Sequence, residues 1–236
     1  MTSSMRDLKV YTTYPHSCSY LENQEATTLF VDPRQPVEQK LYSNLSQLGF
    51  RRSGSHIYRP HCTHCDACIA ARIPVDLFEP RRGQRRTWNR NQDLVVRATD
   101  DMRDDAAFEL YQNYIESRHS DGDMYPPERE QYESFLSNAW DCTRYYRFYD
   151  RDSLVALAVV DELTDGLSAI YTFFDPALDK RSLGGFAVLW QIEKAREMGL
   201  AYLYLGYWVR DCDKMAYKAD YRPLELYVNN RWTTLL

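Results

Sequence analysis

The chain has 236 residues, of which 44% are hydrophobic and 14% aromatic, enough for one large domain or two small ones with ample core. No apolar run approaches the ~20 residues that a membrane-spanning helix needs, and the polar N-terminus lacks the apolar core of a secretory signal. We therefore expect a cytoplasmic protein with no membrane partner. The net charge of −5 argues weakly against nucleic acid as a partner.

Positive charge is nevertheless concentrated in one part of the chain. Between Arg51 and Arg97 the sequence holds ten arginines, no lysine and four acidic residues, a local charge of +6 that leaves −11 for the rest. Such asymmetry indicates one basic face for a polyanion on an otherwise acidic protein.

The N-terminal pattern predicts short strands around one helix. Residues 26–31 are expected to form a strand, and apolar positions at helical spacing predict a helix over 36–48. Residues 50–60 are expected to form a strand or hairpin, and residues 73–78 an extended segment. The arginine-rich residues 81–91 are interpreted as a connection.

The composition turns from basic to acidic around residues 95–99. We therefore predict two domains, a smaller cysteine-containing and basic domain over 1–97 and a second domain over 98–236. Further expected elements of the second domain are helices over 104–119 and 126–138, a strand over 142–150, a short helix over 212–219, and a closing hairpin of 224–228 with 232–235.

Residues 153–208 carry the strongest pattern. Two runs rich in β-branched and aromatic residues on either side of Asp165-Gly166 predict a β-hairpin. An amphipathic helix is expected over 184–198 and a strand over 201–208. Two antiparallel strands, a crossover helix and a strand are the central unit of an N-acetyltransferase-like fold. The predicted fold class is therefore α+β, with an N-acetyltransferase-like C-terminal domain.

In such a unit the strands before and after the helix splay apart and expose backbone groups to an acyl donor. Acyl-CoA enzymes of this kind hold a pyrophosphate on the backbone N–H groups of a glycine-rich helix start. Here that start is Arg181-Ser-Leu-Gly184-Gly-Phe186, so Phe stands at the last small position and the cradle is incomplete. Acyl transfer from a donor other than CoA stays open, beside the alternative that Gly184 serves only close packing.

Three thiols at intervals of three residues form a cysteine cluster, Cys62-Thr-His-Cys65-Asp-Ala-Cys68, and Cys18 is a candidate fourth ligand. In a cytosolic chain this pattern favours a metal over disulfides, and the same thiols could hold zinc or an iron–sulfur cluster. His61 or His64 could replace Cys18. The alternatives are structural cysteines without metal, or a nucleophilic thiol with a histidine base.

Five arginines and one tryptophan share a ten-residue segment: Arg81, Arg82, Arg85, Arg86, Trp88 and Arg90. Guanidinium groups pair with phosphates and an indole can stack on an unpaired base, so these residues predict an RNA-binding site. The alternatives are a solvated loop or an anchor for the acidic half of the chain.

Together these residues resemble the bacterial aspartate/glutamate leucyltransferases, the bacterial branch of the arginyl-tRNA–protein transferases of the N-degron pathway. The matching segments span nearly the whole chain: Cys18-Ser-Tyr-Leu21, Gly49-Phe-Arg-Arg-Ser-Gly54, Tyr58-Arg-Pro-His-Cys-Thr-His-Cys-Asp-Ala-Cys68, Arg118-His-Ser-Asp-Gly122, Asp165-Gly-Leu-Ser-Ala-Ile-Tyr-Thr-Phe-Phe-Asp-Pro176, Tyr204-Leu-Gly-Tyr-Trp208 and Cys212-Asp-Lys-Met-Ala-Tyr-Lys218. The eukaryotic enzymes carry Cys-x-x-Cys near the N-terminus, whereas here Leu21 follows Cys18 by three residues.

The resemblance implies a cytosolic enzyme that moves leucine from leucyl-tRNA to the α-amine of proteins beginning with Asp or Glu, with no cofactor required for the transfer. The arginine-rich segment would then bind the tRNA. Donor choice rests on the resemblance alone.

Amine attack on an ester needs a neutral amine, a stabilised carbonyl oxygen and a proton for the departing ribose oxygen. Where the splayed strands should meet, the candidate catalytic residues are Tyr171, Asp175 and Tyr207. Phe173 and Lys214 are candidate substrate-binding residues, with strand packing the alternative for Phe173. An acidic acceptor side chain needs a cation, preferably a bidentate arginine. The candidates for that cation are Arg51, Arg52 and Arg72.

Two functions of other classes remain. A zinc- or RNA-binding adaptor would explain the cysteines and arginines but leave the acyltransferase-like half unused. A CoA-dependent N-acetyltransferase is disfavoured by Phe186.

Overall fold

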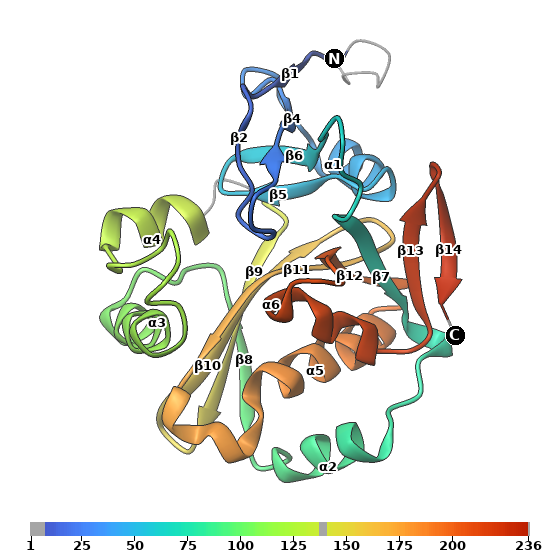
Figure 1. Ribbon diagram of the computed structural model, residues 1–236. Helices are drawn as coiled ribbons and strands as arrows, with labels where there is room; N and C mark the ends of the chain where they lie inside the picture. Colours follow the sequence, from blue (N-terminus) through green and yellow to red (C-terminus); the bar gives the residue numbers. More distant parts are fainter. Residues whose placement is uncertain (1–7, 137–140, 236) are drawn as a thin grey trace.

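The computed structural model describes residues 8–136 and 141–235, and its centre is an eight-stranded mixed sheet (Figure 1). The strand order is β14-β13-β7-β12-β11-β10-β9-β8, and only β11 and β12 pair in parallel. The strands are β7 (Ile69–Pro74), β8 (Val95–Thr99), β9 (Thr143–Asp150), β10 (Ser153–Glu162), β11 (Gly166–Phe174), β12 (Tyr202–Trp208), β13 (Leu224–Val228) and β14 (Arg231–Leu235).

The N-terminal residues form a second, smaller layer at the top of Figure 1. A four-stranded sheet in the order β1-β4-β6-β5 lies beside a two-stranded β2–β3 ribbon. The elements are β1 (Val10–Thr12), β2 (His16–Ser17), β3 (Glu25–Ala26), β4 (Thr28–Val31), α1 (Gln39–Gln47), β5 (Arg51–Ser53) and β6 (His56–Pro60). The strand, the helix and the hairpin expected over 26–60 are thereby confirmed.

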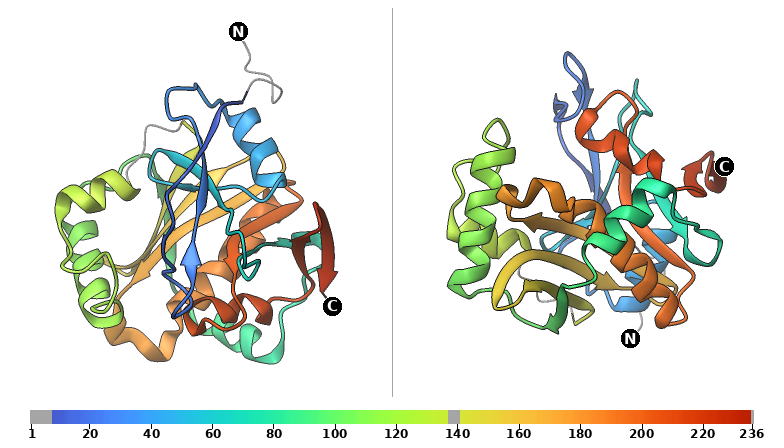
Figure 2. Two further views of the ribbon diagram at one scale, coloured as in Figure 1. Left: turned by 45° about the horizontal axis from the view of Figure 1, so that its top comes forward. Right: turned by 90° about the horizontal axis from the view of Figure 1, so that it is seen from below.

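Helices cover both faces of the central sheet, as the two turned views in Figure 2 show. The helical elements are η2 (Val75–Leu77), α2 (Arg82–Arg90), α3 (Asp105–Arg118), α4 (Arg129–Leu136), η3 (Pro176–Arg181), α5 (Leu183–Glu197), α6 (Asp213–Ala216) and η4 (Tyr217–Asp220). The helix expected over 126–138 is α4, and residues 137 and 138 lie outside the described residues. None of the described helices is long and apolar enough to cross a membrane.

The central strand β10 is buried on both faces, which explains why its sequence is a continuous apolar run rather than an alternating one. Ala158 and Val160 pack in the cluster that contains α5. Leu157 and Val159, with the opposite parity, pack in the cluster that contains α3 and α4. The predicted hairpin, helix and strand of residues 153–208 are confirmed as β10, β11, α5 and β12.

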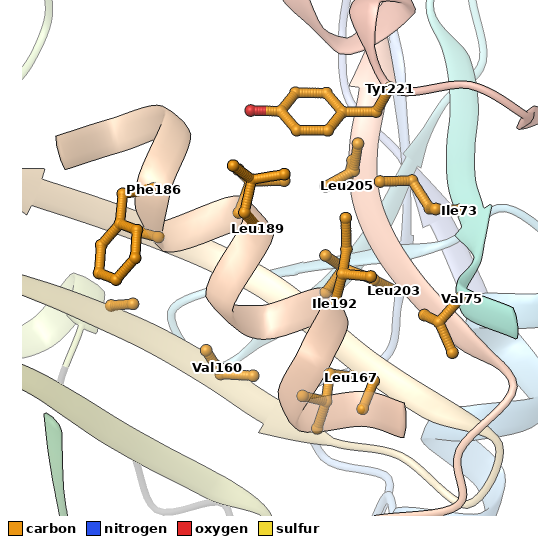
Figure 3. Close-up of a cluster of buried hydrophobic side chains, with 14 of the residues drawn as sticks. Ile73, Val75, Val160, Leu167, Phe186, Leu189, Ile192, Leu203, Leu205 and Tyr221 are labelled. Atoms are coloured by element: carbon orange, nitrogen blue, oxygen red, sulfur yellow. The ribbon is translucent and has the colours of Figure 1, made fainter. Parts of the chain in front are cut away.

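Helix α5 is held against the sheet by one apolar face (Figure 3). Leu189 and Ile192 point toward the side chains of Leu167, Leu203 and Leu205 on the two parallel strands. These side chains are 5% exposed or less, and burying each contributes roughly 1.5–3 kcal/mol. Packing therefore fixes α5 over the junction of β11 and β12.

The arginine-rich segment is helical, so its interpretation as a connection is wrong. The side chain of Gln84 accepts a hydrogen bond from the backbone N–H of Arg81 at 2.8 Å and closes the first turn of α2. Arginine is a good helix former, and the ring of Trp88 packs on Phe186 of α5 at 5.6 Å. Because Trp88 is the single large apolar residue in this cationic helix, the sequence shows almost no hydrophobic periodicity from which the helix could be predicted.

The eight-stranded sheet crosses the predicted division at residues 97 and 98. Strand β7 belongs to the first 97 residues but lies between β12 and β13 in the sheet. The extended segment expected over 73–78 ends early, because β7 stops at Pro74 and the 3₁₀ turn η2 follows. The two-domain division remains a prediction, with one sheet built from both parts.

Candidate active site

The two parallel strands of the sheet part after a short junction. β11 pairs with β12 only from Gly166 to Ser168, although both strands continue for several residues. At the same place the register of β12 with β7 shifts between Tyr204 and Gly206, and Gly206 has a φ of +79° that disfavours any side chain. A wedge therefore opens between the two strands, as expected for a unit that receives an acyl donor.

A cavity of about 1010 Å³ lies in this wedge. Its lining includes the parted segments of β11 and β12, the first turns of α5, one side of α2, the end of α3 and the α6–η4 segment. The volume suits a ligand rather than a single water or ion.

Arg51, on β5, reaches into the wedge. Its Nη1 donates to Ser168 Oγ at 3.1 Å, and its Nη2 donates to the backbone carbonyl of Ala169 at 2.6 Å, where β11 has left β12. A Cβ atom on Gly206 would lie 2.8 Å from Cζ of Arg51, so the guanidinium also lies against β12. Among the ion pairs of the described residues, none includes Arg51.

Arg52 is engaged inside the protein instead. Its Nε and Nη2 donate to the two carboxylate oxygens of Asp161 at 2.6 and 2.9 Å, and both side chains are 0% exposed. The same carboxylate accepts from the hydroxyls of Tyr42 and Thr143. Although Arg52 borders the cavity, this network joins the N-terminal layer to β10 and leaves Arg52 no free face for a substrate.

Arg72 also serves the protein. It lies on β7, where Nε donates to Glu225 at 2.7 Å and the guanidinium lies 3.5 Å from the ring centre of Tyr202 and 4.2 Å from that of Trp232. It does not line the cavity. Of the three arginines predicted to recognise an acidic side chain, the structure brings Arg51 to the wedge and keeps Arg52 and Arg72 in packed ion pairs.

The three predicted catalytic residues differ in position. Tyr171 lines the cavity, its hydroxyl is buried without a hydrogen-bond partner in the described part of the chain, and burial raises its pKa. Tyr207 also lines the cavity, but its hydroxyl lies 2.9 Å from the carbonyl of Gly49 and 3.2 Å from that of Tyr58. Asp175 caps η3 by accepting from the N–H of Ala177 at 2.9 Å and is not part of the lining.

Of the two predicted substrate-binding residues, one is in the core and one is at the cavity. Phe173 is 0% exposed and packs against the rings of Tyr111 and Tyr132. Lys214 lines the cavity, and its Nζ forms an ion pair with Asp121 at 2.9 Å, with both side chains more than half exposed. This pair links α6 to the segment after α3.

A buried lysine in the cavity was missed by the sequence analysis. Lys218 is 5% exposed, lines the cavity, and donates from Nζ to the backbone carbonyl of Tyr207. Desolvation, followed by the positive charge of Arg51, lowers its pKa to about 7. Nothing in its spacing distinguishes it from a surface lysine, and only the fold shows that it is buried.

The predicted tRNA-binding arginines are exposed, four of them on α2 and Arg81 at its N-cap, where Arg81 also lines the cavity: Arg81, Arg82, Arg85, Arg86 and Arg90. The ion pairs found within residues 8–136 and 141–235 include none of them. Arg85 and Arg90 donate to backbone carbonyls. The side of α2 that carries Gln84 and Thr87 borders the cavity.

The four predicted metal ligands line a second pocket of about 490 Å³: Cys18, Cys62, Cys65 and Cys68. Burial, with the neighbouring thiols, raises the pKa of Cys68 to about 12. In the described residues, no three side chains of the metal-ligating types are placed to hold one ion as they stand. The side chains thus share a pocket without forming a ligand set, and a shared metal stays a prediction.

Comparison with known proteins identifies the family. Residues 16–86 match the arginine-tRNA-protein transferase N terminus, and residues 106–228 match the C terminus of the same family. The chain belongs to the arginine-tRNA-protein transferase family. Three relatives of this transferase are each named aspartate/glutamate leucyltransferase.

The three relatives match over nearly their whole length. The Teredinibacter turnerae protein is 53% identical over 99% of this chain and 96% of its own. The Pseudomonas fluorescens protein is 54% identical over 97% of each chain, and the Stutzerimonas stutzeri protein 54% identical over 100% of each. Among solved structures, L-PGS from Bacillus licheniformis is 13% identical and overlaps 71% of this chain and 48% of its own at a TM-score of 0.46.

The wedge of this transferase predicts a difference between two glycine substitutions. Gly206→Ala and Gly199→Ala both place a side chain at a positive φ, which costs roughly 1–2 kcal/mol of stability. Only the Cβ at position 206 would collide with Arg51, because nothing lies within 4 Å of a Cβ at position 199. We expect comparable losses in urea unfolding but a fall in aminoacyl transfer of about tenfold or more for Gly206→Ala alone, since displaced groups in a site slow reaction steeply. Equal transfer rates at equal stability would contradict this reading of the wedge.

Proposed function

We propose that this chain transfers leucine from leucyl-tRNA to the N-terminal α-amine of proteins that begin with Asp or Glu, which marks those proteins for degradation. The names of the full-length relatives and the family membership support this activity. The observation that carries it is the excess of basic over acidic side chains in the lining of the wedge cavity. Five basic side chains line it, and the acidic residue among the described lining is an exposed aspartate, Asp220.

The lining favours an apolar donor side chain. Val188, Leu189 and Leu205 are 4–7% exposed and line the cavity together with Ile170. An arginyl side chain would meet the positive charge of Arg51, and the described lining of the cavity offers no buried carboxylate to balance it. A leucyl side chain instead gains the hydrophobic contribution of these contacts.

Arg51 is the proposed partner of the acceptor's acidic side chain. Two of its N–H groups are used by Ser168 and Ala169, and no carboxylate of the described residues pairs with it. Its remaining N–H groups can therefore receive an Asp or Glu carboxylate at the wedge, where charge-assisted hydrogen bonds are strong. Asn and Gln keep the shape but lose that charge.

The C-terminal unit is proposed to act as an N-acetyltransferase-like acyl-transfer domain with an aminoacyl ester, rather than acyl-CoA, as donor. Phe186 is 3% exposed and packs against Trp88 and Phe148, so its ring occupies the core beside the helix start. The tRNA is proposed to lie along the arginines of α2, whose inner side borders the cavity. Backbone phosphates would then lead the 3′ end to the wedge.

The reaction joins the acceptor's α-nitrogen to the carbonyl carbon of the leucyl ester and releases a ribose oxygen. Because the ester is already activated, positioning supplies much of the rate without a covalent enzyme intermediate. Tyr171 keeps its proton at neutral pH, since burial raises its pKa, and its unpaired hydroxyl can donate to the carbonyl oxygen as that oxygen gains charge. Asp175 and Tyr207 stay predictions, with their polar groups committed to a cap and to backbone carbonyls.

No step of this reaction passes through the cysteine pocket. A zinc or iron–sulfur site shared by its four cysteines remains a prediction that metal content measured after anaerobic purification would decide. Tyr58 and Tyr207 line both pockets, so the cysteine pocket borders the wedge cavity at these two side chains.

The proposed function is tested by donor and acceptor choice together. Leucyl-, phenylalanyl- and arginyl-tRNA, each radiolabelled, are offered with peptides headed by Asp, Asn or Lys. We expect leucine transfer to Asp-headed peptides about a hundredfold faster than to Asn-headed ones, because an Asn leaves Arg51 unpaired in a half-buried site. Arg51→Gln should bring the two rates close together, whereas Arg103→Gln, an exposed arginine in a surface pair, should leave them unchanged.

Preferred transfer to Lys-headed peptides would contradict the acceptor assignment. No transfer by the wild-type protein from any donor would favour the adaptor hypothesis.

The role of α2 is tested by the salt dependence of binding. Replacing Arg81, Arg82, Arg85 and Arg86 with Gln should weaken leucyl-tRNA binding and flatten its dependence on salt, since each phosphate contact removed releases about one counterion fewer. The matched control removes the same charge from four exposed arginines elsewhere, at positions 34, 103, 151 and 231. The tRNA assignment is wrong if both quadruple variants bind with the same affinity and salt slope.

A further inference from the structure

The transfer requires a proton acceptor that the sequence did not reveal. A peptide α-amine has a pKa of about 7.7–8.0, so at neutral pH most acceptors arrive as ammonium ions that cannot attack an ester. A group that receives this proton must line the cavity and be neutral at the pH of reaction. This group must also lie near the wedge between β11 and β12, because a group at the mouth of the cavity could not reach the reacting nitrogen.

Lys218 meets the geometric conditions. It lines the wedge cavity, is 5% exposed, and its Nζ donates to the carbonyl of Tyr207 on β12, one residue after Gly206. Nζ also lies 3.4 Å from Met215 Sδ, and the ion pairs formed by the described residues include no carboxylate bound to Lys218. A neutral amine can keep one N–H on the Tyr207 carbonyl and still offer its lone pair.

We propose that Lys218 is the general base and acid of the transfer, and that it exchanges its proton with both the acceptor amine and the departing ribose oxygen. The neutral Lys218 amine takes a proton from the acceptor's α-ammonium. The freed α-nitrogen then bonds to the ester carbonyl carbon, and the carbon–oxygen bond to ribose breaks. From ammonium to amide the attacking nitrogen loses two protons: one reaches the ribose oxygen through Lys218, and the other is released to solvent. This inference rests on the proposed function.

The surroundings of Lys218 lower its pKa, so that a large fraction of its amine is neutral near neutral pH. Desolvation is the main cause that lowers its pKa to about 7, and the positive charge of Arg51 adds to it. The thiols of Cys212 and Cys68 oppose the shift, and the ring of Tyr217 lies 5.8 Å from Nζ. An acceptor carboxylate bound to Arg51 would offset part of the Arg51 charge and so raise the proton affinity of Lys218 when the correct acceptor is in place.

Other titratable groups of the cavity fit the role less well. Burial raises the pKa of Tyr171 and of Tyr207, so neither hydroxyl ionises near neutral pH to accept a proton. Asp220 is exposed. His119 is half-buried beside the Lys214–Asp121 pair, with Nε2 3.2 Å from the Tyr114 hydroxyl, and it is the rival that the experiment must separate from Lys218.

The test is the pH profile of leucyl transfer to an Asp-headed peptide. For the wild type, kcat/KM should fall about tenfold per pH unit below pH 7, as Lys218 becomes protonated. Lys218→Met should lower the rate about a hundredfold or more and move the limb to near pH 8, because the α-amine must then lose its proton without Lys218. Lys40→Met, an exposed lysine on α1, is the matched control and should keep the wild-type rate and profile.

Rescue separates proton transfer from structural support. Lys218→Ala should regain rate with added tertiary amines, which accept protons but cannot form an amide, in proportion to their basicity. Lys218→Arg keeps a cation but stays protonated, so it should remain slow. Circular dichroism and urea unfolding check that each variant is folded.

Two results would overturn the proposal while leaving the proposed function intact. The first is a pH profile of Lys218→Met that keeps the wild-type limb near pH 7. The second is a pH profile of His119→Asn that loses this limb. A wild-type protein that transfers no leucine at all would overturn the proposed function itself.

Discussion

The early parting of β11 and β12 is the constraint on which the site depends. After three paired residues the two strands lose each other's hydrogen bonds, and buried backbone groups need other partners. A basic side chain donates to a freed carbonyl on each side: Arg51 donates to Ala169 on β11, and Lys218 donates to Tyr207 on β12. These two N–H donors thus replace strand pairing inside the wedge, and the charge of Arg51 supports the proposed preference for acidic acceptors.

The N-terminal layer fixes one of these cations through a buried ion pair. Arg52 holds Asp161 on β10 with two hydrogen bonds in a fully buried site, and its neighbour Arg51 is thereby aimed at the wedge. Breaking such a pair by removing one partner typically costs about 3–5 kcal/mol, so the position of β5 is well determined. The layer that carries the cysteines therefore contributes Arg51 to the proposed acyl-transfer site, although the cysteine pocket is separate from the wedge cavity.

The sequence predicted the elements whose residues pack on both faces of the sheet, since the runs in β10 and β11 and the helix α5 have strong apolar patterns. The sequence did not predict helix α2, because its arginines leave no hydrophobic periodicity. It also did not predict the place of β7 inside the sheet, which depends on long-range strand pairing. Within the site, the sequence correctly predicted that Arg51 and Tyr171 lie at the cavity. It could not tell that Arg51 faces the cavity while Arg52 forms a buried ion pair, because the environments of two adjacent strand residues are set by how the strand packs. Lys218 had no local signal, since desolvation is a property of the fold.

The central claim is that the leucyl ester lies in the wedge between β11 and β12. The most direct measurement is a structure of the protein with 3′-leucylamido-adenosine, in which an amide replaces the reactive ester. We predict that the leucyl group contacts Val188, Leu189 and Leu205 and that its carbonyl lies between the parted strands, within reach of Tyr171. Binding of the analogue at the cysteine pocket, or outside the cavity altogether, would contradict the account.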